Sequence, residues 1–561
     1  MDDQDGAYLP IVASTYGAAL ASVTRNRNLR IAQLSSLSAW TGEFLFLTAI
    51  TVYAYQENGP AGVGVIGFLR VLPTTFALPL LGTLGDHMSR RWLLVVMSLL
   101  RAATAAGAAA AAAGGLPVVT YALVTVSTIC FSAYRPVLAA LLPTLCTTPA
   151  ELASANAVRS VLDGVASLIG PLAAAGILAA SSPAAAFVAV AALSAVAALL
   201  VATLRYESLP QQVEDGTRTR IRIFGGMVDG LRELRAGNRA SVVIVLGAFQ
   251  CLVRGALLVL AVVIAVRLTG MGQAGVGVLW AGFGVGGLVA AMATVGAAGS
   301  NRLGTLFGIG IAGWGVPIVL AGLVLHSWMA VAAFTIMGAA NALVDVTGFT
   351  LLQRLAPDPM LARILTVTEA VFALAVALGS LVTAPLLSAI GDSATIIAMG
   401  CVLPIVVALY VGRLRAIDAD IRVRTDRIDL LRQVSTLRLL PIAAIEGLAL
   451  YLEHVRVEAG RDVFRAGDPG DGFYVIESGE VAIIKQGRDV SHLGPGGSFG
   501  EIALLRSVPR TATVRATTDA EFAIVSGPRF VAAVTGFSAT SAAAEQNMSN
   551  YLSKELQDAR F

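Results

Sequence analysis

Charged side chains are scarce in this chain of 561 residues. Asp, Glu, Lys and Arg make up 13% of the sequence, whereas 56% of the residues are hydrophobic and the mean hydropathy is +0.77. A water-soluble chain of this length usually carries about a quarter charged residues, spread over several domains of about 100–200 residues. The composition therefore argues against a water-soluble enzyme.

Residue patterns for several kinds of chemistry are also missing. The four cysteines are isolated in or near apolar segments without CxxC spacing, so we expect neither disulfides nor a zinc site. The basic residues form no stripe interleaved with aromatics, which make up 6% of the chain, so we expect no nucleic-acid partner. The sequence holds no nucleophile–base arrangement and no Walker-type phosphate loop. Enzyme activity, a bound metal or cofactor, and ATP-driven transport thus have no support in the sequence.

Long apolar stretches dominate the first 415 residues. A bilayer core about 30 Å thick needs about 20 apolar residues per helix, and about twelve stretches of that length are present. A longer polar segment, 205–239, divides them into two sets of six. The expected spans are 31–55, 63–84, 92–113, 117–143, 156–180, 184–204, 240–267, 274–298, 304–325, 328–352, 364–389 and 394–413.

The basic residues predict the orientation of these spans in a cell membrane. Arginines precede the first span, follow the last, and lie in the second-to-third, central and eighth-to-ninth loops, whereas the opposite loops, QENGPAG, GGLP, SSPA, LHSW and GDSA, contain neither Arg nor Lys. Because cytoplasmic loops carry the excess of Lys and Arg, both termini are expected in the cytoplasm. The acidic start, MDDQDGAYLP, lacks the basic region of a cleaved signal peptide, so the first span is expected to remain as a signal anchor.

The chain changes character after Arg415. Of its 75 charged residues, 35 lie in this last quarter, where Leu and Ile first recur at helical spacing and short strand-like runs bounded by glycines then follow. The predicted fold is therefore an all-α polytopic membrane protein of twelve helices in two six-helix halves, joined to a soluble α+β domain built on a β-roll. The expected segments are an N-terminus 1–30, halves 31–204 and 240–413, a linker helix 414–440 and the soluble domain 441–556.

The loop after the second span, GTLGDHMSRR, carries a recognisable motif. It resembles the G-x-L-(A/G)-D-(R/K)-x-G-(R/K)-(R/K) motif of the major facilitator superfamily, with His87 and Ser89 as departures. The resemblance implies a conformational latch in which the carboxylate caps a helix N-terminus and pairs with arginines of neighbouring helix ends. The matching residues are Gly82, Gly85, Asp86, Arg90 and Arg91.

Further segments narrow the resemblance. FSAYRPVLAALLPTL, the run from Glu151 to Leu178 and the tenth span look like the enterobactin-exporter and macrolide-efflux branch of the same superfamily, whose members are secondary exporters. Gly170-Pro171 with Gly176 is similar to an antiporter motif of the fifth helix, although the trailing glycine pair is absent. These likenesses imply export, while Gly and Pro are also frequent in any membrane helix.

Charged residues inside the spans point to a transport pathway. A charge at the bilayer centre costs about 2.5–3.5 kcal/mol, so it normally faces the bundle interior and pairs there. Arginines near helix ends, namely Arg101, Arg159 and Arg267, are expected to snorkel. A carboxyl exposed alternately to two sides can carry a proton, but a carboxyl satisfied by an Arg across a helix interface fits equally well. The proton-coupling and transport candidates are Glu43, Arg135, Asp345 and Glu369, with Glu43 and Asp345 placed first.

The clearest motif in the chain is GSFGEIALLRSVPRTATVRA, residues 497–516. It resembles the phosphate-binding cassette of cyclic-nucleotide-binding domains, and FRAGDPGDGFYVIESGEVAII matches the preceding strands of that family. The resemblance implies that a short helix beginning near Gly500 faces the phosphate, that Glu501 accepts from the ribose 2′-hydroxyl and that Arg510 holds the cyclic phosphate. The implied binding residues are Gly500, Glu501, Ile502, Ala503, Arg510, Thr511 and Ala512.

Thr511 is the residue of the motif that bears on the choice between adenine and guanine. In the family, a Thr or Ser after the arginine can bond guanine, whereas Ala there goes with cAMP-only sites, so Thr511 leaves cGMP possible while cAMP is favoured. The residue that covers the base could be Phe530, Phe537 or Tyr551 of the expected last helix, 528–556.

Together these features predict a secondary active transporter in the lipid bilayer, a proton-coupled exporter of a small amphipathic molecule that cyclic nucleotide regulates. A homodimer is possible, because cyclic-nucleotide domains often associate. Two alternatives stay open: a membrane-anchored nucleotide receptor whose transporter-like domain moves nothing, and a transporter of lipids or lysolipids. The sequence does not identify the substrate or the sign of regulation.

Overall fold

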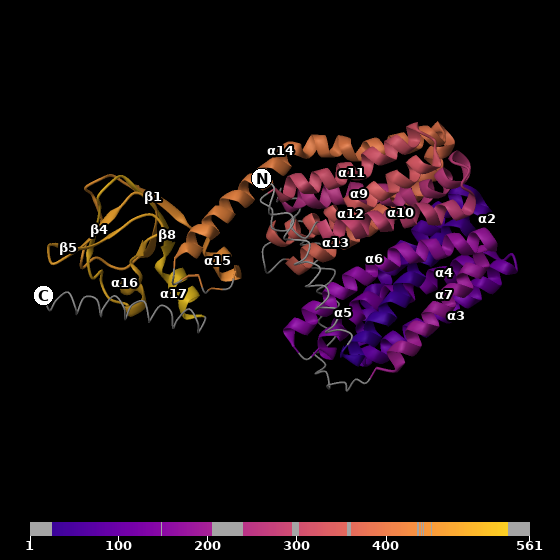
Figure 1. The fold of residues 1–561 in the computed structure, drawn as a ribbon, viewed down its shortest axis with the longest axis horizontal. Coiled ribbons are helices and arrows are strands. Elements are labelled where there is room, and N and C mark those ends of the chain that lie inside the picture. Colours follow the sequence, from indigo (N-terminus) through magenta and orange to yellow (C-terminus); the bar gives the residue numbers. More distant parts are fainter. Residues whose placement is uncertain are drawn as a thin grey trace. The chain divides into compact units, whose positions relative to one another are not determined.

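Long helices fill the first part of the chain and a small β-roll follows them (Figure 1). The structure, a computed structural model, describes residues 25–536 except 147, 205–238, 294–301, 356–360, 435–436, 439, 441 and 450, and the side chains of 78–87 lie outside that description. The chain divides into two compact units, Met1–Arg415 and Ala416–Phe561. The predicted fold class, a polytopic helical membrane protein with a soluble α+β domain, is confirmed.

Eleven helices of the described residues are long and apolar enough to cross a membrane. The number is lower than twelve because the first two expected spans fall in one element, α2, which is kinked at Asn58 and Gly59, where the backbone leaves helical geometry. Gly59 has φ +57°, a conformation that side chains other than glycine rarely adopt. Helices α4 (Pro117–Ser132) and α5 (Tyr134–Leu145) together form one of the eleven spans. The other helices are α2 (Arg27–His87), α3 (Arg90–Ala113), α6 (Pro149–Ala180), α7 (Pro183–Ala202), α9 (Ala240–Val263) continued by the π-helical η1 (Ile264–Leu268), α10 (Gly272–Ala293), α11 (Leu303–Leu323), α12 (Ser327–Leu355), α13 (Leu361–Ile390) and α14 (Asp392–Gln433).

Small residues let the two sets of helices approach closely. Helices α2, α3, α4, α6 and α7 pack on one another, as do α9 to α13, and the two sets meet where α6 contacts α10 and where α2 contacts α9 and α13. At these contacts a Cβ added at Gly64 would lie 2.6 Å from the Ser380 carbonyl oxygen, and one at Gly284 would lie 2.6 Å from that of Ser167. The glycines therefore allow the backbones of the two sets to touch.

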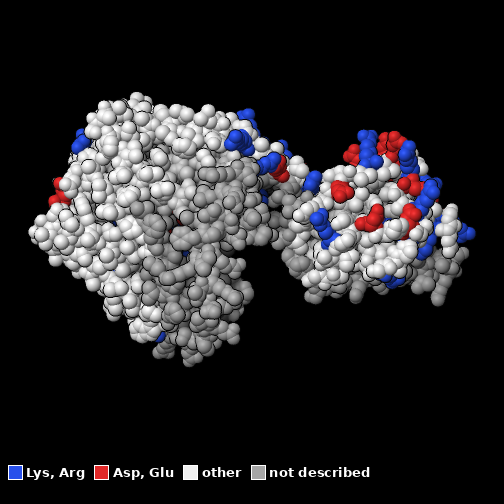
Figure 2. All heavy atoms as spheres, turned by 180° about the vertical axis from the view of Figure 1, so that it is seen from behind, with Lys and Arg blue, Asp and Glu red and all other residues white. Residues whose placement is uncertain are grey.

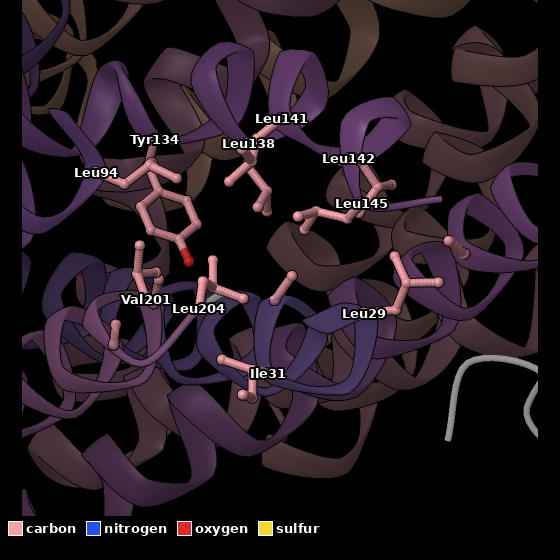
Figure 3. Packing of buried hydrophobic residues seen from close by; sticks show 14 of the residues in the cluster. Leu29, Ile31, Leu94, Tyr134, Leu138, Leu141, Leu142, Leu145, Val201 and Leu204 are labelled. Carbon is pink, nitrogen blue, oxygen red and sulfur yellow. The ribbon is translucent and has the colours of Figure 1, made fainter. Parts of the chain in front are cut away.

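One end of the first set is closed by a leucine-rich cluster (Figure 3). Leu138, Leu141, Leu142 and Leu145 of α5 lie opposite Leu29 and Leu204, which come from the ends of α2 and α7. The Tyr134 hydroxyl shares a hydrogen bond of 2.7 Å with Ser35 Oγ in the same cluster. The cluster also contains Leu94 and Val95 from the first turns of α3, the helix that follows the loop of the predicted latch.

Helix α14 is longer than the sequence suggested. The last span was expected to end at 413 and a separate linker helix to follow, but one uninterrupted helix runs from Asp392 to Gln433. No proline occurs between Pro404 and Pro441, so nothing in the backbone forces a break.

The soluble unit is a roll of two four-stranded antiparallel sheets. Their strand orders are β1-β8-β3-β6 and β2-β7-β4-β5. Charged side chains cover this unit, whereas the visible surface of the membrane unit is almost free of them (Figure 2). The elements are α15 (Ile442–Ala449), β1 (Glu453–Val457), β2 (Asp462–Phe464), β3 (Gly472–Ser478), β4 (Val481–Lys485), β5 (Arg488–Leu493), β6 (Ser498–Phe499), α16 (Glu501–Arg506), β7 (Thr513–Ala516), β8 (Ala520–Ser526) and α17 (Gly527–Thr535).

Candidate functional site

A cavity of about 270 Å³ opens into the β-roll between the strands and α16. Its volume lies near the lower end of the range of about 300–1,000 Å³ that small-molecule sites commonly have. One part of the wall is polar and comes from the segment around α16 and the loop before β7. The other part is mainly apolar and comes from β4 and β5.

Arg510 is the central cation of the polar wall. Its side chain is 1% exposed, and its Nη2 donates to Asp471 Oδ1 at 2.7 Å and to the Gly472 carbonyl at 2.8 Å, while Nη1 donates to the Gly500 carbonyl at 3.0 Å. The guanidinium lies over the Phe464 ring at 4.1 Å. Its buried Nε has no partner among the described residues. A fixed, desolvated guanidinium with a donor to spare is suited to hold an anion.

Gly500 allows the Arg510 guanidinium to approach the backbone before α16 closely. It adopts φ +97°, and a Cβ at this position would lie 2.7 Å from Arg510 Nη1. The sequence therefore needs glycine here for two reasons, the left-handed backbone and the close approach of the guanidinium.

Glu501, the first residue of α16, supplies a carboxylate beside the cation. Its buried Oε2 has no hydrogen-bond partner among the described residues. Burial raises the pKa of this carboxyl above its usual value near 4.5, and the charge of Arg510 offsets part of that rise. A buried acceptor without a donor points to a hydroxyl or amide that a ligand would bring.

All seven residues that the sequence suggested for nucleotide binding line this one cavity, and their roles in binding stay predictions. They are Gly500, Glu501, Ile502, Ala503, Arg510, Thr511 and Ala512. The residues that other strands contribute were not predicted from the sequence. Alternation along β4, where residues two apart share a face, could have found some of them. The missed lining residues are Phe464, Ile483, Lys485, Val490, Ser491, Leu493, Ser498, Phe499 and Val514.

One of the three candidates for covering the base is wrong. Phe530 is fully buried, stacks on Phe473 with ring centroids 4.3 Å apart, and does not line the cavity. The residues Phe537 and Tyr551, and most of the last helix expected over 528–556, lie outside the described residues.

In the membrane unit, Glu43 is held by two arginines from other spans. Its Oε1 lies 2.7 Å from Arg70 Nη2 and its Oε2 lies 2.7 Å from Arg101 Nη2. Arg101 is 3% exposed and its guanidinium lies 4.1 Å from the Phe131 ring centroid. The expectation that Arg101 snorkels to the membrane surface is therefore wrong, because its partner is a buried carboxylate on α2.

The other predicted charges belong to a second group. Asp345 on α12 accepts from Asn341 Nδ2 at 2.7 Å, and Arg254, Arg135 and Glu369 act on it electrostatically. Their side chains are exposed although they lie within membrane helices, and no ion pair joins them among the described residues. Ionisable residues inside membrane helices normally face the bundle interior or a water-filled cavity and mark substrate or proton pathways. Arg254 also belongs to this group, although it is not among the four transport candidates predicted from the sequence.

The predicted latch is partly outside the described residues. The side chains of Gly82, Gly85 and Asp86 are not described, so their pairing stays a prediction, but the N-cap of α3 is Ser89 and not Asp86. Arg90 Nη1 donates to the Ala140 carbonyl at 2.6 Å, and Arg91 Nη2 donates to the Ala202 carbonyl. Arg90 thus holds a carbonyl group in the middle of α5, and Arg91 holds the carbonyl group of the last residue of α7.

Two family models match the chain. The description "Major Facilitator Superfamily" matches residues 34–380, and "Cyclic nucleotide-binding domain" matches residues 454–535. In solved structures, the nucleoside transporter NupG is similar over 69% of this chain and 99% of its own, with a TM-score of 0.59 and 12% identity. A POT family transporter in complex with a thioalcohol-conjugated peptide is similar over 70% and 96%, with a TM-score of 0.56 and 13% identity. At this identity the likeness shows the fold.

The C-terminal unit has curated relatives among regulatory proteins. The chain is 48% identical over 66 residues to a cAMP-dependent protein kinase regulatory subunit of Yarrowia lipolytica, covering 12% of this chain and 18% of that protein. It is 51% identical over 72 residues to the corresponding subunit of Eremothecium gossypii, covering 13% and 16%. The chain thus spans less than a fifth of the length of these two relatives.

Proposed function

The chain belongs to the Major Facilitator Superfamily, and from that membership we propose that it is a secondary active transporter, a proton-coupled exporter of a small amphipathic molecule, regulated by cyclic nucleotide. The fused cyclic-nucleotide-binding domain, with Arg510 and Glu501 facing one cavity, is the observation that carries the regulatory part. We place the protein in the cell membrane with both termini in the cytoplasm, because the arginines gather in alternate loops. The proposal of export rests on the narrower sequence resemblance to the enterobactin-exporter and macrolide-efflux branch. The family model identifies the superfamily and no branch within it.

We assign the nucleotide contacts from the geometry of the cavity. Arg510 holds the cyclic phosphate through its unpartnered Nε, and the Glu501 carboxylate accepts from the ribose 2′-hydroxyl. The first ligand to test is cAMP, since the curated relatives are named cAMP-dependent.

Asp345 is the proton carrier that the contacts support best. It accepts a hydrogen bond from Asn341, and neighbouring charges of both signs act on it without forming an ion pair among the described residues. A carboxyl in such a group can take up a proton from one side and release it to the other as the two halves alternate.

Helix α14 offers the route from nucleotide to transport. Its last turn contributes Leu431 to a buried cluster that also contains Val434, Phe473, Phe530 and Leu504. Leu504 belongs to α16, whose first residues line the cavity. A shift of α16 on binding therefore moves the end of an unbroken helix whose other end is the last membrane span. Allosteric coupling of about 1–3 kcal/mol would change the transport rate roughly 5- to 150-fold.

Proteoliposomes loaded with a pH dye, with ethidium as the amphipathic probe, test this proposal. We expect ethidium-dependent proton flux that changes at least fivefold with saturating cAMP. Flux should fall at least tenfold in Asp345→Asn because the proton carrier is lost, whereas Asp392→Asn, at the start of α14, removes a carboxyl outside the group and should retain flux.

An insertion separates regulation from transport in the same assay. Two glycines placed between Arg422 and Val423, both exposed on α14, should interrupt the helix and leave flux and nucleotide binding intact while the response to cAMP disappears. Flux that ignores cAMP in the unmodified protein contradicts regulation, and binding of cAMP without any flux favours the receptor alternative.

The raised pKa of Glu501 predicts how nucleotide binding depends on pH. In the free domain burial raises this pKa, so the carboxyl keeps its proton to higher pH than usual, and a ribose hydroxyl that donates to the carboxylate lowers the pKa in the complex. Binding therefore releases a proton, and affinity should weaken as the pH falls through the raised pKa. Calorimetry of cAMP binding between pH 5 and 8, in buffers of different ionisation enthalpy, measures both effects. Glu501→Gln should bind more weakly and without this pH dependence, and an equal slope in this variant would show that another group titrates.

A further inference from the structure

Lys485 faces the nucleotide cavity from a strand that carries no recognised motif. It is the last residue of β4 and lies two positions after Ile483, so the two side chains share one face of the strand. Both line the cavity, whereas Ile484 between them does not. The Lys485 side chain is half-buried. The cavity wall therefore contains a second cation besides Arg510.

The strand register separates the two cations. Ile484 pairs with Thr513, so Lys485 continues beside Ala512 and next to Thr511 as the two antiparallel strands extend. Arg510 instead donates to the carbonyl groups of Gly472, at the start of β3, and Gly500, which precedes α16. The wall around Lys485 is otherwise apolar and comes from Ile483, Val490 and Leu493, with the Ser491 hydroxyl. With the phosphate on Arg510, this wall is where a purine base would lie.

The two purines present different edges to an ammonium group. A lysine ammonium has three donors and no acceptor. Guanine offers two adjacent acceptors, O6 and N7, whereas adenine offers N7 beside an amino group that is itself a donor. An ammonium at the base wall thus has two partners on guanine and meets a donor on adenine. The chain has 39 basic residues, of which two are lysines, Lys485 and Lys554.

We propose that Lys485 is a base-selecting residue whose ammonium donates to the O6 and N7 edge of guanine, so that this domain binds cGMP with an affinity close to its affinity for cAMP. The inference rests on the proposed nucleotide site and adds to it a contact outside the phosphate-binding cassette. Thr511, whose exposed hydroxyl also lines the cavity, supplies an acceptor for the guanine 2-amino group.

Calorimetric titration of the purified full-length protein with cAMP and cGMP tests the proposal through Lys485→Met, which keeps the length of the side chain and removes its charge. We expect cGMP binding to weaken about tenfold, the order of discrimination that one two-acceptor contact provides, while cAMP binding changes less than twofold. Arg488→Met is the matched control, because Arg488 pairs with Lys485 across the same hairpin but does not line the cavity. It should alter neither affinity.

Cyclic inosine monophosphate separates the two guanine contacts. This nucleotide keeps O6 and N7 but lacks the 2-amino group. Lys485→Met should therefore weaken its binding as much as that of cGMP, whereas Thr511→Ala should weaken cGMP alone.

Three results would overturn the role of Lys485 while leaving the nucleotide site in place: equal weakening of cAMP and cGMP in Lys485→Met, no weakening of either, or the same loss of cGMP in Arg488→Met. A wild-type protein that binds cAMP at least a hundredfold more tightly than cGMP also contradicts it. Failure of the unmodified protein to bind any of the three nucleotides would instead contradict the proposed function.

Discussion

Glu43→Gln is expected to lower the free energy of unfolding of the membrane unit by about 3–5 kcal/mol, the cost of leaving buried charges without their partner. Glu43 holds Arg70 and Arg101, each at 2.7 Å, and the three side chains are 13%, 11% and 3% exposed. A neutral amide offers one weaker acceptor to two guanidinium groups that already carry a net positive charge. Reversible unfolding in mixed detergent and sodium dodecyl sulfate micelles measures the difference.

A triple replacement is the control for this effect. Changing Glu43, Arg70 and Arg101 together to Met removes the charges with their desolvation cost, and stability should return to within about 1–2 kcal/mol of the wild type. The outcome also decides between the two roles weighed for Glu43. A Glu43→Gln protein that unfolds like the wild type but has lost proton flux would contradict the structural role and assign coupling to Glu43.

The helical part of the fold could be predicted because each span is defined by its own residues. Apolar length and Gly/Pro punctuation located the spans, since a bilayer requires a continuous apolar helix whatever its neighbours are. Continuity was harder to predict, because a helix can pass from apolar to charged sequence without a break. The segment DADIRVRTDRID has helix-compatible residues throughout, so α14 continues where the change in composition suggested a boundary.

Ion pairs between different membrane helices could not be predicted, because they depend on how the helices pack. The partner of Arg101 lies 58 positions earlier in the chain, and the packing of both α3 and α2 on α7 and α4 brings the two together. Position in a span therefore says little about whether an arginine reaches the surface or a carboxylate.

In the nucleotide site, too, residues close together in the sequence were predicted, whereas residues that the fold brings in from elsewhere were not. Residues 500–512 form one continuous segment around α16, so a local motif was enough to place Gly500, Glu501 and Arg510 together. Asp471 and Lys485 reach the site from the loop before β3 and from the end of β4, and their approach depends on strand register. Periodicity gives the face of a strand but not the cavity that this face meets.

Arg510→Gln is expected to weaken cAMP binding about 10- to 150-fold, because a charge-assisted hydrogen bond contributes about 1.5–3 kcal/mol and every 1.4 kcal/mol is tenfold in affinity. Gln keeps a polar end but loses the charge and the planar fork that the buried site holds in place. Arg510→Lys should recover little, since an ammonium cannot replace the bonds to Gly500, Gly472 and Asp471 while also reaching a phosphate. Calorimetry on the full-length protein measures the affinities.

The internal bonds of Arg510 make a folding defect the competing explanation, and a second variant removes it. Asp471→Asn breaks the same ion pair but leaves the guanidinium in the cavity, and it frees a donor for the phosphate. If Arg510 acts on the ligand, this variant binds cAMP as tightly as the wild type or more tightly, whereas a purely structural Arg510 makes both variants fail together. Arg515→Gln removes an equal charge from β7 at a site paired with Asp462 outside the cavity, so a loss of affinity there would attribute the effect to the net charge of the domain.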